Sequence, residues 1–208
     1  MSEPNIVIVD YQAGNVSSVQ KAIIASGGNA EISSSPNDIS GADALVFPGQ
    51  GACDSSMREL NHRNLVEPIK DFIKSGKPFL GICLGLQLLL DGSDEGDEPG
   101  LSILGGHNYR LPDNLKVPHM GWNKVNFHRS HPLFDGIPNG SYFYFVHSYY
   151  ANLYDKEFVI GTTEYGIDFC SAAGTKNVLA VQFHPEKSGA LGLRIYNQFV
   201  QLVRKARL

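Results

Sequence analysis

The sequence predicts an α/β fold with a mostly parallel central sheet, flanked by helices and extended by antiparallel strands in the second half. Two observations predict it: apolar runs alternate with amphipathic segments in the first half, and turn-rich sequence with scattered strands follows. Short apolar runs rich in β-branched residues are typical of strands that helices cover on both faces. The 208 residues suit one well-filled domain, so we expect residues 1–208 to form a single domain.

The first elements are expected to be a strand, a helix and a strand. Residues 6–9 form an unbroken Ile-Val-Ile-Val run. Asn15 is a suitable N-cap for a helix over 16–26, whose apolar residues recur on one face until a glycine pair ends it. Residues 44–47 form the next apolar strand. This order is the beginning of a parallel sheet with crossover helices.

The same rhythm continues to the middle of the chain. Apolar residues at helical spacing predict a helix over 65–74, which Gly76 ends. Residues 79–82 are a strand that leads directly into a helix over 84–90. These elements complete a βαβαβ pattern.

The second half has a different character. Residues 91–140 are rich in Gly, Pro, Asn and Asp, so we expect short strands at most. Aromatic and β-branched runs predict strands over 142–146, 158–162 and 178–183. One apolar stripe predicts a closing helix over 189–204.

Composition excludes several classes of function. The net charge is −4 and no Lys/Arg-rich run occurs, so we expect no nucleic-acid partner. The apolar runs are too short to span a bilayer, and three widely spaced cysteines favour a reducing, cytoplasmic location without disulfides. No metal-ligand spacing occurs, the acidic run at 93–98 is expected to be a solvated loop, and we expect no metal and no cofactor.

The segment Gly81-Ile82-Cys83-Leu84-Gly85 carries the clearest chemical signal. It has the G-x-nucleophile-x-G pattern of a sharp strand-to-helix turn, with cysteine as the nucleophile. Glycines on either side avoid collisions at such a bend. The adjoining helix N-terminus favours the reactive thiolate, so Cys83 is the expected nucleophile.

A thiolate nucleophile needs a base and a group that orients the base. Among seven histidines, His184 stands out because Glu186 follows two residues later, on the same side of an extended chain. His184 also follows a predicted strand, as Cys83 does, and sites in open α/β sheets gather at the carboxyl ends of strands. We therefore expect Cys83, His184 and Glu186 to meet.

The loop Pro48-Gly49-Gln50-Gly51 follows another predicted strand. Glycines let its backbone approach a substrate closely. Amides of Gln50 and Gly51, with that of Leu84, are candidates for an oxyanion hole.

Three strings in this order, PGQG at 48–51, GICLGLQ at 81–87 and HPEKS at 184–188, resemble class I glutamine amidotransferases with a Cys-His-Glu triad. VPHMGWN at 117–123 and FVHSYY at 145–150 are similar to the glutaminase subunits of imidazole glycerol phosphate synthases, which act in histidine biosynthesis. The resemblance covers nearly the whole chain. It implies the single-domain class I glutamine amidotransferase fold.

The resemblance also implies roles for individual residues. Cys83 attacks the side-chain amide of L-glutamine, His184 transfers protons and Glu186 orients His184, giving ammonia, a glutamyl thioester and then glutamate. Other positions match those that bind glutamine: Gly49, Gln87, Ser148 and Tyr149. A third set matches positions that face the partner, a (β/α)8-barrel cyclase subunit in a heterodimer: Asn15, Met120, Trp122 and Lys187.

One departure from the family pattern lies in the oxyanion loop, where Gln50 replaces a small apolar residue. We expect this loop to rest in a poor geometry that the partner corrects. Alternatives remain open: a class I amidotransferase subunit of another synthase, such as one making anthranilate, pyridoxal phosphate or carbamoyl phosphate, a stand-alone cysteine hydrolase, or a binding module that has kept the fold.

Overall fold

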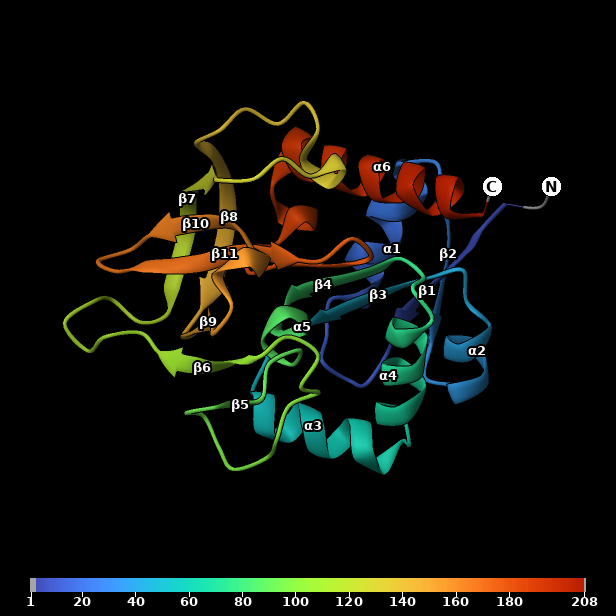
Figure 1. Cartoon of the computed structure of the whole chain (residues 1–208), viewed down its shortest axis with the longest axis horizontal. Helices are drawn as coiled ribbons and strands as arrows, with labels where there is room; N and C mark the ends of the chain where they lie inside the picture. Colours follow the sequence, from blue (N-terminus) through green and yellow to red (C-terminus); the bar gives the residue numbers. More distant parts are fainter. Residues whose placement is uncertain (1–2, 208) are drawn as a thin grey trace.

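One twelve-stranded sheet runs through the protein, whose computed structural model describes residues 3–207. The strand order is β2-β1-β3-β4-β12-β11-β10-β7-β8, with β5, β6 and β9 attached beside this path (Figure 1). Pairing is parallel from β2 to β12. The parallel half consists of β1 (Asn5–Val9), β2 (Asn29–Ser33), β3 (Ala44–Gly49), β4 (Phe79–Cys83) and β12 (Val178–Val181).

The second half of the chain continues this sheet with antiparallel strands. Pairing changes from parallel to antiparallel between β12 and its neighbour β11, and the strands β11, β10, β7 and β8 then pair with one another antiparallel. This half comprises β6 (Gly106–Arg110), β7 (His119–Phe127), β8 (Ser141–His147), β9 (Tyr149–Leu153), β10 (Val159–Glu164) and β11 (Asp168–Gly174), with the short β5 (Gly92–Ser93) beside β6. The α/β fold class with added antiparallel strands is confirmed.

Helices cover both faces of the parallel half. Ile6 and Ile8 point to one face, where α1 (Val16–Ala25) and α6 (Gly189–Ala206) pack on them. Val7 and Val9 point to the other face, which is covered by α2 (Pro36–Gly41), α3 (Cys53–His62) and α4 (Val66–Lys74). Figure 1 shows the two helical layers on opposite sides of β1, β3 and β4. The carboxyl ends of these strands are thereby left free to carry a site.

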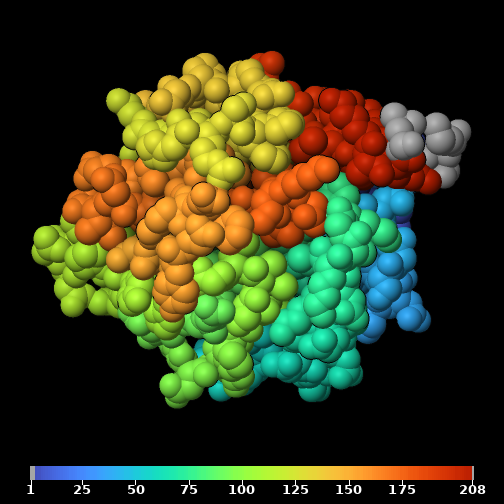
Figure 2. Space-filling model, in the orientation of Figure 1, coloured from blue at the N-terminus to red at the C-terminus, as the bar shows by residue number. Residues whose placement is uncertain are grey.

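The surface shows the same two parts as the sheet, one formed by the antiparallel half and one by the N-terminal, parallel half. In Figure 2 the yellow and orange segments of the antiparallel half gather on one side, away from the blue N-terminal segments. The red helix α6 returns across the molecule to the blue side, where Arg204 reaches Glu3 at 3.1 Å. Over residues 3–207, no helix has the length and apolar character that crossing a bilayer requires.

Most predicted elements are present, and three expectations are wrong. The region 91–140 contains the nine-residue strand β7, whose side chains are mostly not buried, so no apolar run announces it. The helix after Cys83 is short, because α5 spans only Leu84–Gln87 and ends in tighter turns. Asn15 precedes α1 but does not cap it, since its φ of 64° is left-handed and its side chain makes no capping bond.

Candidate active site

Cys83 sits at a strained bend where β4 turns into α5. Its φ of 55° and ψ of −104° are unusual for a residue with a side chain. Neighbouring glycines make the bend possible: a Cβ at Gly85 would lie 1.8 Å from the carbonyl oxygen of Phe47. At Gly81 a Cβ would lie 2.9 Å from the oxygen of Gly85. The close packing of α5 on β3 and β4 therefore fixes the direction of the Cys83 sulfur.

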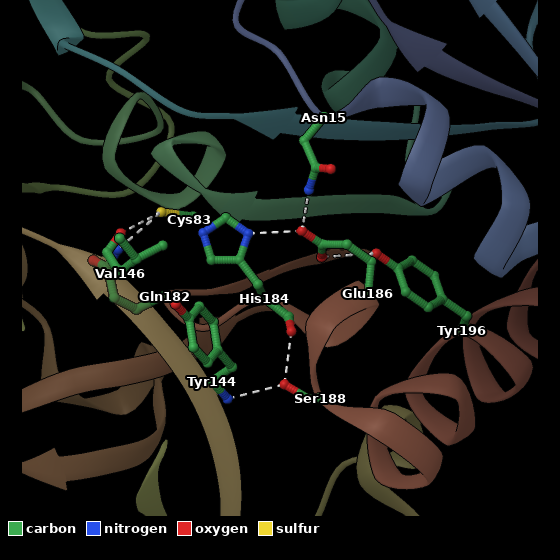
Figure 3. A network of polar contacts seen from close by, with 9 residues as sticks. All are labelled: Asn15, Cys83, Tyr144, Val146, Gln182, His184, Glu186, Ser188 and Tyr196. Atoms are coloured by element: carbon green, nitrogen blue, oxygen red, sulfur yellow. Dashed lines mark hydrogen bonds and ion pairs between the residues drawn. The ribbon is translucent and has the colours of Figure 1, made fainter. Parts of the chain in front are cut away.

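The imidazole of His184 lies between Cys83 and Glu186, as Figure 3 shows. Its Nδ1 is 2.7 Å from Oε1 of Glu186, and both side chains are almost completely buried. Backbone contacts hold the ring in place, because the His184 N–H donates to Tyr144 and the Ser188 hydroxyl donates to the His184 carbonyl oxygen. The three residues predicted to form a triad are thus brought together from β4 and from the η3 turn (Pro185–Lys187) that follows β12.

The remaining nitrogen of His184 faces the sulfur. Nε2 is buried and has no hydrogen-bond partner among residues 3–207. Burial by itself lowers the pKa of His184, but the negative charges of a Cys83 thiolate and of Glu186 outweigh it and raise the pKa to about 10. The site therefore favours the protonated imidazolium form of His184, with the proton held where a leaving group would need it.

Glu186 is itself held by two side chains. Its Oε1 also accepts a hydrogen bond from the Asn15 amide, and its Oε2 accepts one from the Tyr196 hydroxyl at 3.4 Å. Burial and the adjacent Glu186 charge raise the pKa of Tyr196 well above 10, so it remains a donor. Asn15 thus belongs to the network behind His184, which explains why it does not cap α1.

Two contacts at the Cys83 sulfur were not predicted from the sequence. The Gln182 amide lies 3.6 Å from Sγ as a donor, and the Val146 carbonyl oxygen lies 3.8 Å away as an acceptor (Figure 3). Gln182 is fully buried two residues before His184, a position that the alternation of an extended chain could have indicated. Burial raises the pKa of Cys53 and Cys170 to about 12, so neither competes as a nucleophile.

A cavity of about 440 Å³ opens beside the sulfur. Its walls include the predicted nucleophile Cys83 and all but Gly49 of the residues predicted for substrate and oxyanion binding: Gln50, Gly51, Leu84, Gln87, Ser148 and Tyr149. Glu95, Tyr144 and His147 also line it, and none of them was predicted. The volume suits an amino-acid side chain with its α-groups.

The chain is similar to a known protein family and to named proteins over nearly its whole length. The family model described as glutamine amidotransferase class-I matches residues 7–202. Three relatives are named imidazole glycerol phosphate synthase subunit HisH: 46% identical in Dehalococcoides mccartyi strain CBDB1, 48% in Moorella thermoacetica and 50% in Rhodopirellula baltica. The matches cover 95%, 97% and 93% of this chain, and 97%, 96% and 96% of the relatives.

The chain belongs to the HisH family of class I glutamine amidotransferases. Solved structures of low identity share the fold. A putative GMP synthase subunit from Thermoplasma acidophilum has a TM-score of 0.75 at 19% identity, covering 100% of this chain and 97% of its own. PurLQS from Thermotoga maritima has a TM-score of 0.76 at 15% identity, with both chains fully covered. These neighbours confirm the predicted amidotransferase fold.

In this HisH-family chain, the loop at residues 48–51 lies next to the nucleophile, and its Gln50 backbone amide already makes a hydrogen bond. The N–H of Gln50 donates to the Ala13 carbonyl oxygen at 2.8 Å, so it does not point into the cavity. Gly49 pairs with Cys83 in the register of β3 and β4. A Cβ at Gly49 would meet the Tyr11 hydroxyl at 2.1 Å, which explains a glycine at this position.

Gln87, predicted to bind substrate, is part of the cavity floor. Its amide nitrogen donates to the Tyr149 carbonyl oxygen at 2.8 Å and to Gln182 at 3.2 Å. Its amide oxygen accepts a hydrogen bond from the Cys53 thiol at 3.8 Å. These contacts fix the orientation of the Gln87 amide.

Two of the residues predicted to face a partner are exposed on β7. Met120 is 60% exposed and Trp122 is 55% exposed, although both are large and apolar. The Trp122 ring meets Tyr144 edge-on at 6.3 Å, and the Lys187 ammonium lies 5.8 Å from the same Tyr144 ring. The cavity mouth and this apolar surface are continuous, because Met120 and Lys187 also line the cavity.

The acidic run at 93–98 is more ordered than a solvated loop. Glu95 is half-buried and accepts a 2.6 Å hydrogen bond from the Cys53 N–H at the start of α3. Asp94 lies 2.8 Å from the ring of His107. In the described part of the chain, no group of three or more potential ligands is arranged to hold a metal ion.

Proposed function

We propose that this chain is the glutaminase subunit of an imidazole glycerol phosphate synthase. One observation carries the proposal: a buried, unpartnered His184 Nε2 faces the Cys83 sulfur while Nδ1 is bound to Glu186. Relatives that are 46–50% identical over nearly their whole length carry the name of that subunit. We further propose a cytoplasmic location, since the three free cysteines include a nucleophile that must stay reduced.

The reaction follows from the positions of the groups. The Cys83 thiolate attacks the side-chain carbonyl carbon of L-glutamine, and the imidazolium of His184 gives its proton to the departing amine, which leaves as ammonia. His184 then takes a proton from a water molecule, which attacks the carbonyl carbon of the thioester. The carbon–sulfur bond breaks, its electron pair stays on the Cys83 sulfur, and glutamate leaves. Glu186 keeps a proton on Nδ1 of His184, so the proton that is transferred in the reaction is gained and lost at Nε2.

The partner in this proposal is the cyclase subunit, forming a heterodimer. Ammonia that escapes into neutral water gains a proton and stops being a nucleophile, so a closed passage to the synthase site is needed. The exposed Met120 and Trp122 on β7 support a partner surface there, with Met120 and Lys187 at the cavity. In this proposal Asn15, which is bonded to Glu186, also faces the partner. Apolar side chains of this size are commonly buried at subunit contacts.

The resting loop next to Cys83 fits a subunit that waits for its partner. With the Gln50 amide bound to Ala13, an oxyanion hole of Gln50, Gly51 and Leu84 lacks one of its donors. Loss of one such donor costs about 10²–10³ in kcat. We therefore propose that the complex turns over glutamine much faster than the isolated chain. Equal rates of glutamate release in the two would contradict this.

The decisive test replaces the nucleophile. Cys83→Ala in the complex with the cyclase should abolish synthesis from glutamine and leave synthesis from added ammonium salts intact. Cys170→Ala is the matched control, because Cys170 is buried on β11 and lies outside the cavity lining. If Cys83→Ala still uses glutamine, the nucleophile is misassigned. If ammonium salts also fail, the change has damaged the complex and a repeat with Cys83→Ser must decide between glutamine-specific and general loss.

A further inference from the structure

Two histidines of the strings VPHMGWN and FVHSYY form a buried pair. His119 on β7 and His147 on β8 lie opposite each other, and His119 Nδ1 is 2.9 Å from His147 Nε2. They are 3% and 6% exposed. The His119 ring also stacks on Tyr165, with centroids 4.0 Å apart. Neither histidine has a role in the proposed chemistry.

The direction of every hydrogen bond in this pair is fixed from both ends. At one end the Tyr149 carbonyl oxygen can only accept, so His147 Nδ1 donates to it at 2.8 Å and Nε2 is the acceptor. His119 Nδ1 must then be the donor to His147.

At the other end of the pair, the Asn123 side chain independently gives the same donor and acceptor roles for His119. The Asn123 side-chain oxygen accepts from the Lys124 N–H, so its amide nitrogen is the group that faces His119 Nε2 at 3.3 Å and donates to it. His119 therefore accepts at Nε2 and donates at Nδ1. Both rings are neutral and each has one allowed tautomer.

Burial agrees with neutral rings. It lowers the pKa of His119 to about 4 and that of His147 to about 3. Neither ring gains a proton near neutral pH, so the chain of donors from Asn123 to Tyr149 persists across the working range of an enzyme.

The chain of hydrogen bonds ends on the substrate strap, which we define as residues 147–149, where β8 ends and β9 begins. Its Tyr149 carbonyl oxygen accepts from His147 on one side and from Gln87 on the other, both at 2.8 Å. The Ser148 carbonyl oxygen accepts from the Leu111 N–H at 2.9 Å. All three strap residues line the cavity beside Cys83. The strap is thus held from several sides, and the histidine pair supplies the hold from β7.

We propose that His119 and His147 are positioning residues that shape the substrate strap to receive the α-amino and α-carboxylate groups of the amide substrate. This proposal rests on the glutaminase function proposed above. In this proposal the pair acts through the strap, on substrate binding and not on the nucleophile. Loss of the His119 donor leaves His147 Nε2 buried without a partner, and the strap loosens.

The test compares two substitutions of His119 in the complex with the cyclase. His119→Phe keeps the ring stacked on Tyr165 but removes both nitrogens, whereas His119→Asn keeps a donor near the Nδ1 position. We expect His119→Phe to raise KM for glutamine about tenfold with kcat within about twofold, because one hydrogen bond is lost from substrate positioning. His119→Asn should recover most of the wild-type KM. His128→Asn is the control, since His128 bonds Thr162 outside the strap.

Labelling of Cys83 provides a readout that a merely structural role would not move. A glutamine-like chloroketone carries the α-groups, whereas iodoacetamide does not. His119→Phe should slow labelling by the chloroketone about tenfold and leave iodoacetamide labelling unchanged, following the change in KM. Equal slowing of both reagents, or an unchanged KM, would overturn the proposal.

Two further measurements separate the possible failures. If His119→Phe does not fold, Asn123→Ala tests the same chain of hydrogen bonds at a half-buried site. It removes the donor to His119, together with the bonds of Asn123 to the Glu164 carbonyl oxygen and the Lys124 N–H, and should raise KM in the same direction. An unchanged KM there would also overturn the proposal. If the wild-type complex neither releases glutamate nor reacts with the chloroketone, the glutaminase function itself fails. That result is distinct from a wild-type enzyme whose variants show no change.

Discussion

The charge of Glu186 is predicted to contribute, after that of Cys83, to the raised pKa of His184. The Glu186 side chain is completely buried, and its Oε1 accepts from both His184 Nδ1 and the Asn15 amide. In Glu186→Gln the amide oxygen is expected to keep this place, because only an acceptor satisfies two donors. The substitution therefore removes the charge and preserves the orientation of the ring.

The size of the effect follows from the kind of bond lost. Hydrogen bonds to charged groups contribute about 1.5–3 kcal/mol and neutral ones about 0.5–1.5 kcal/mol, so the change removes about 1.5 kcal/mol. Since the carboxylate raises the pKa of His184, its loss must lower that pKa, by about one unit for this free energy. The imidazolium then loses its proton at lower pH.

The measurement is an NMR titration of ring-labelled histidine in the wild type and in Glu186→Gln, together with kcat/KM for glutamine in the complex. We expect the His184 titration to move down by about one pH unit and kcat/KM to fall at least about tenfold. Glu157→Gln is the control, because Glu157 is exposed. An unchanged His184 titration, or a Glu186→Gln enzyme with full activity, would refute this reasoning.

Further predictions concern stability and coupling. Cys83→Gly should be about 1 kcal/mol more stable than Cys83→Ala in urea unfolding, because glycine relieves the positive φ at this position. Equal unfolding midpoints would count against backbone strain. Gly85→Ala should cost more than about 2 kcal/mol or prevent folding, since its Cβ would overlap the Phe47 carbonyl oxygen, and wild-type stability would contradict the packing. The pKa of His184 is raised from 6.5 to about 10. Its contribution to the free energy of unfolding is therefore complete below pH 6.5 and is lost as the pH rises toward 10. Urea unfolding across this range should show a steeper fall in the free energy of unfolding for the wild type than for His184→Gln. Lys187→Ala in the complex should lower the ratio of synthase product to glutamate more than it lowers glutamate release, and an unchanged ratio would argue against a coupling role.

The sequence by itself indicated most strands of the parallel half, though not β2, and the three residues that we propose as the triad. Strands covered on both faces must be continuous apolar runs, so β1, β3 and β4 were visible, and the carboxyl ends of such strands must share one edge. The glycines at 81 and 85 indicated the bend at Cys83, and the two-residue spacing indicated that Glu186 backs His184. These signals are local, and each lies within a few residues.

Only the tertiary structure decided which distant side chains complete the site. Asn15 reads as a helix cap, yet it donates to Glu186 across 171 positions of the chain. The strand β7 escaped prediction because its residues are mostly not buried, and its two partners are β8, the next strand, and the more distant β10. The His119–His147 pair exists only through that pairing. A hydrogen bond between distant residues leaves no periodicity in the sequence, since it depends on register between strands and not on the pattern within either one.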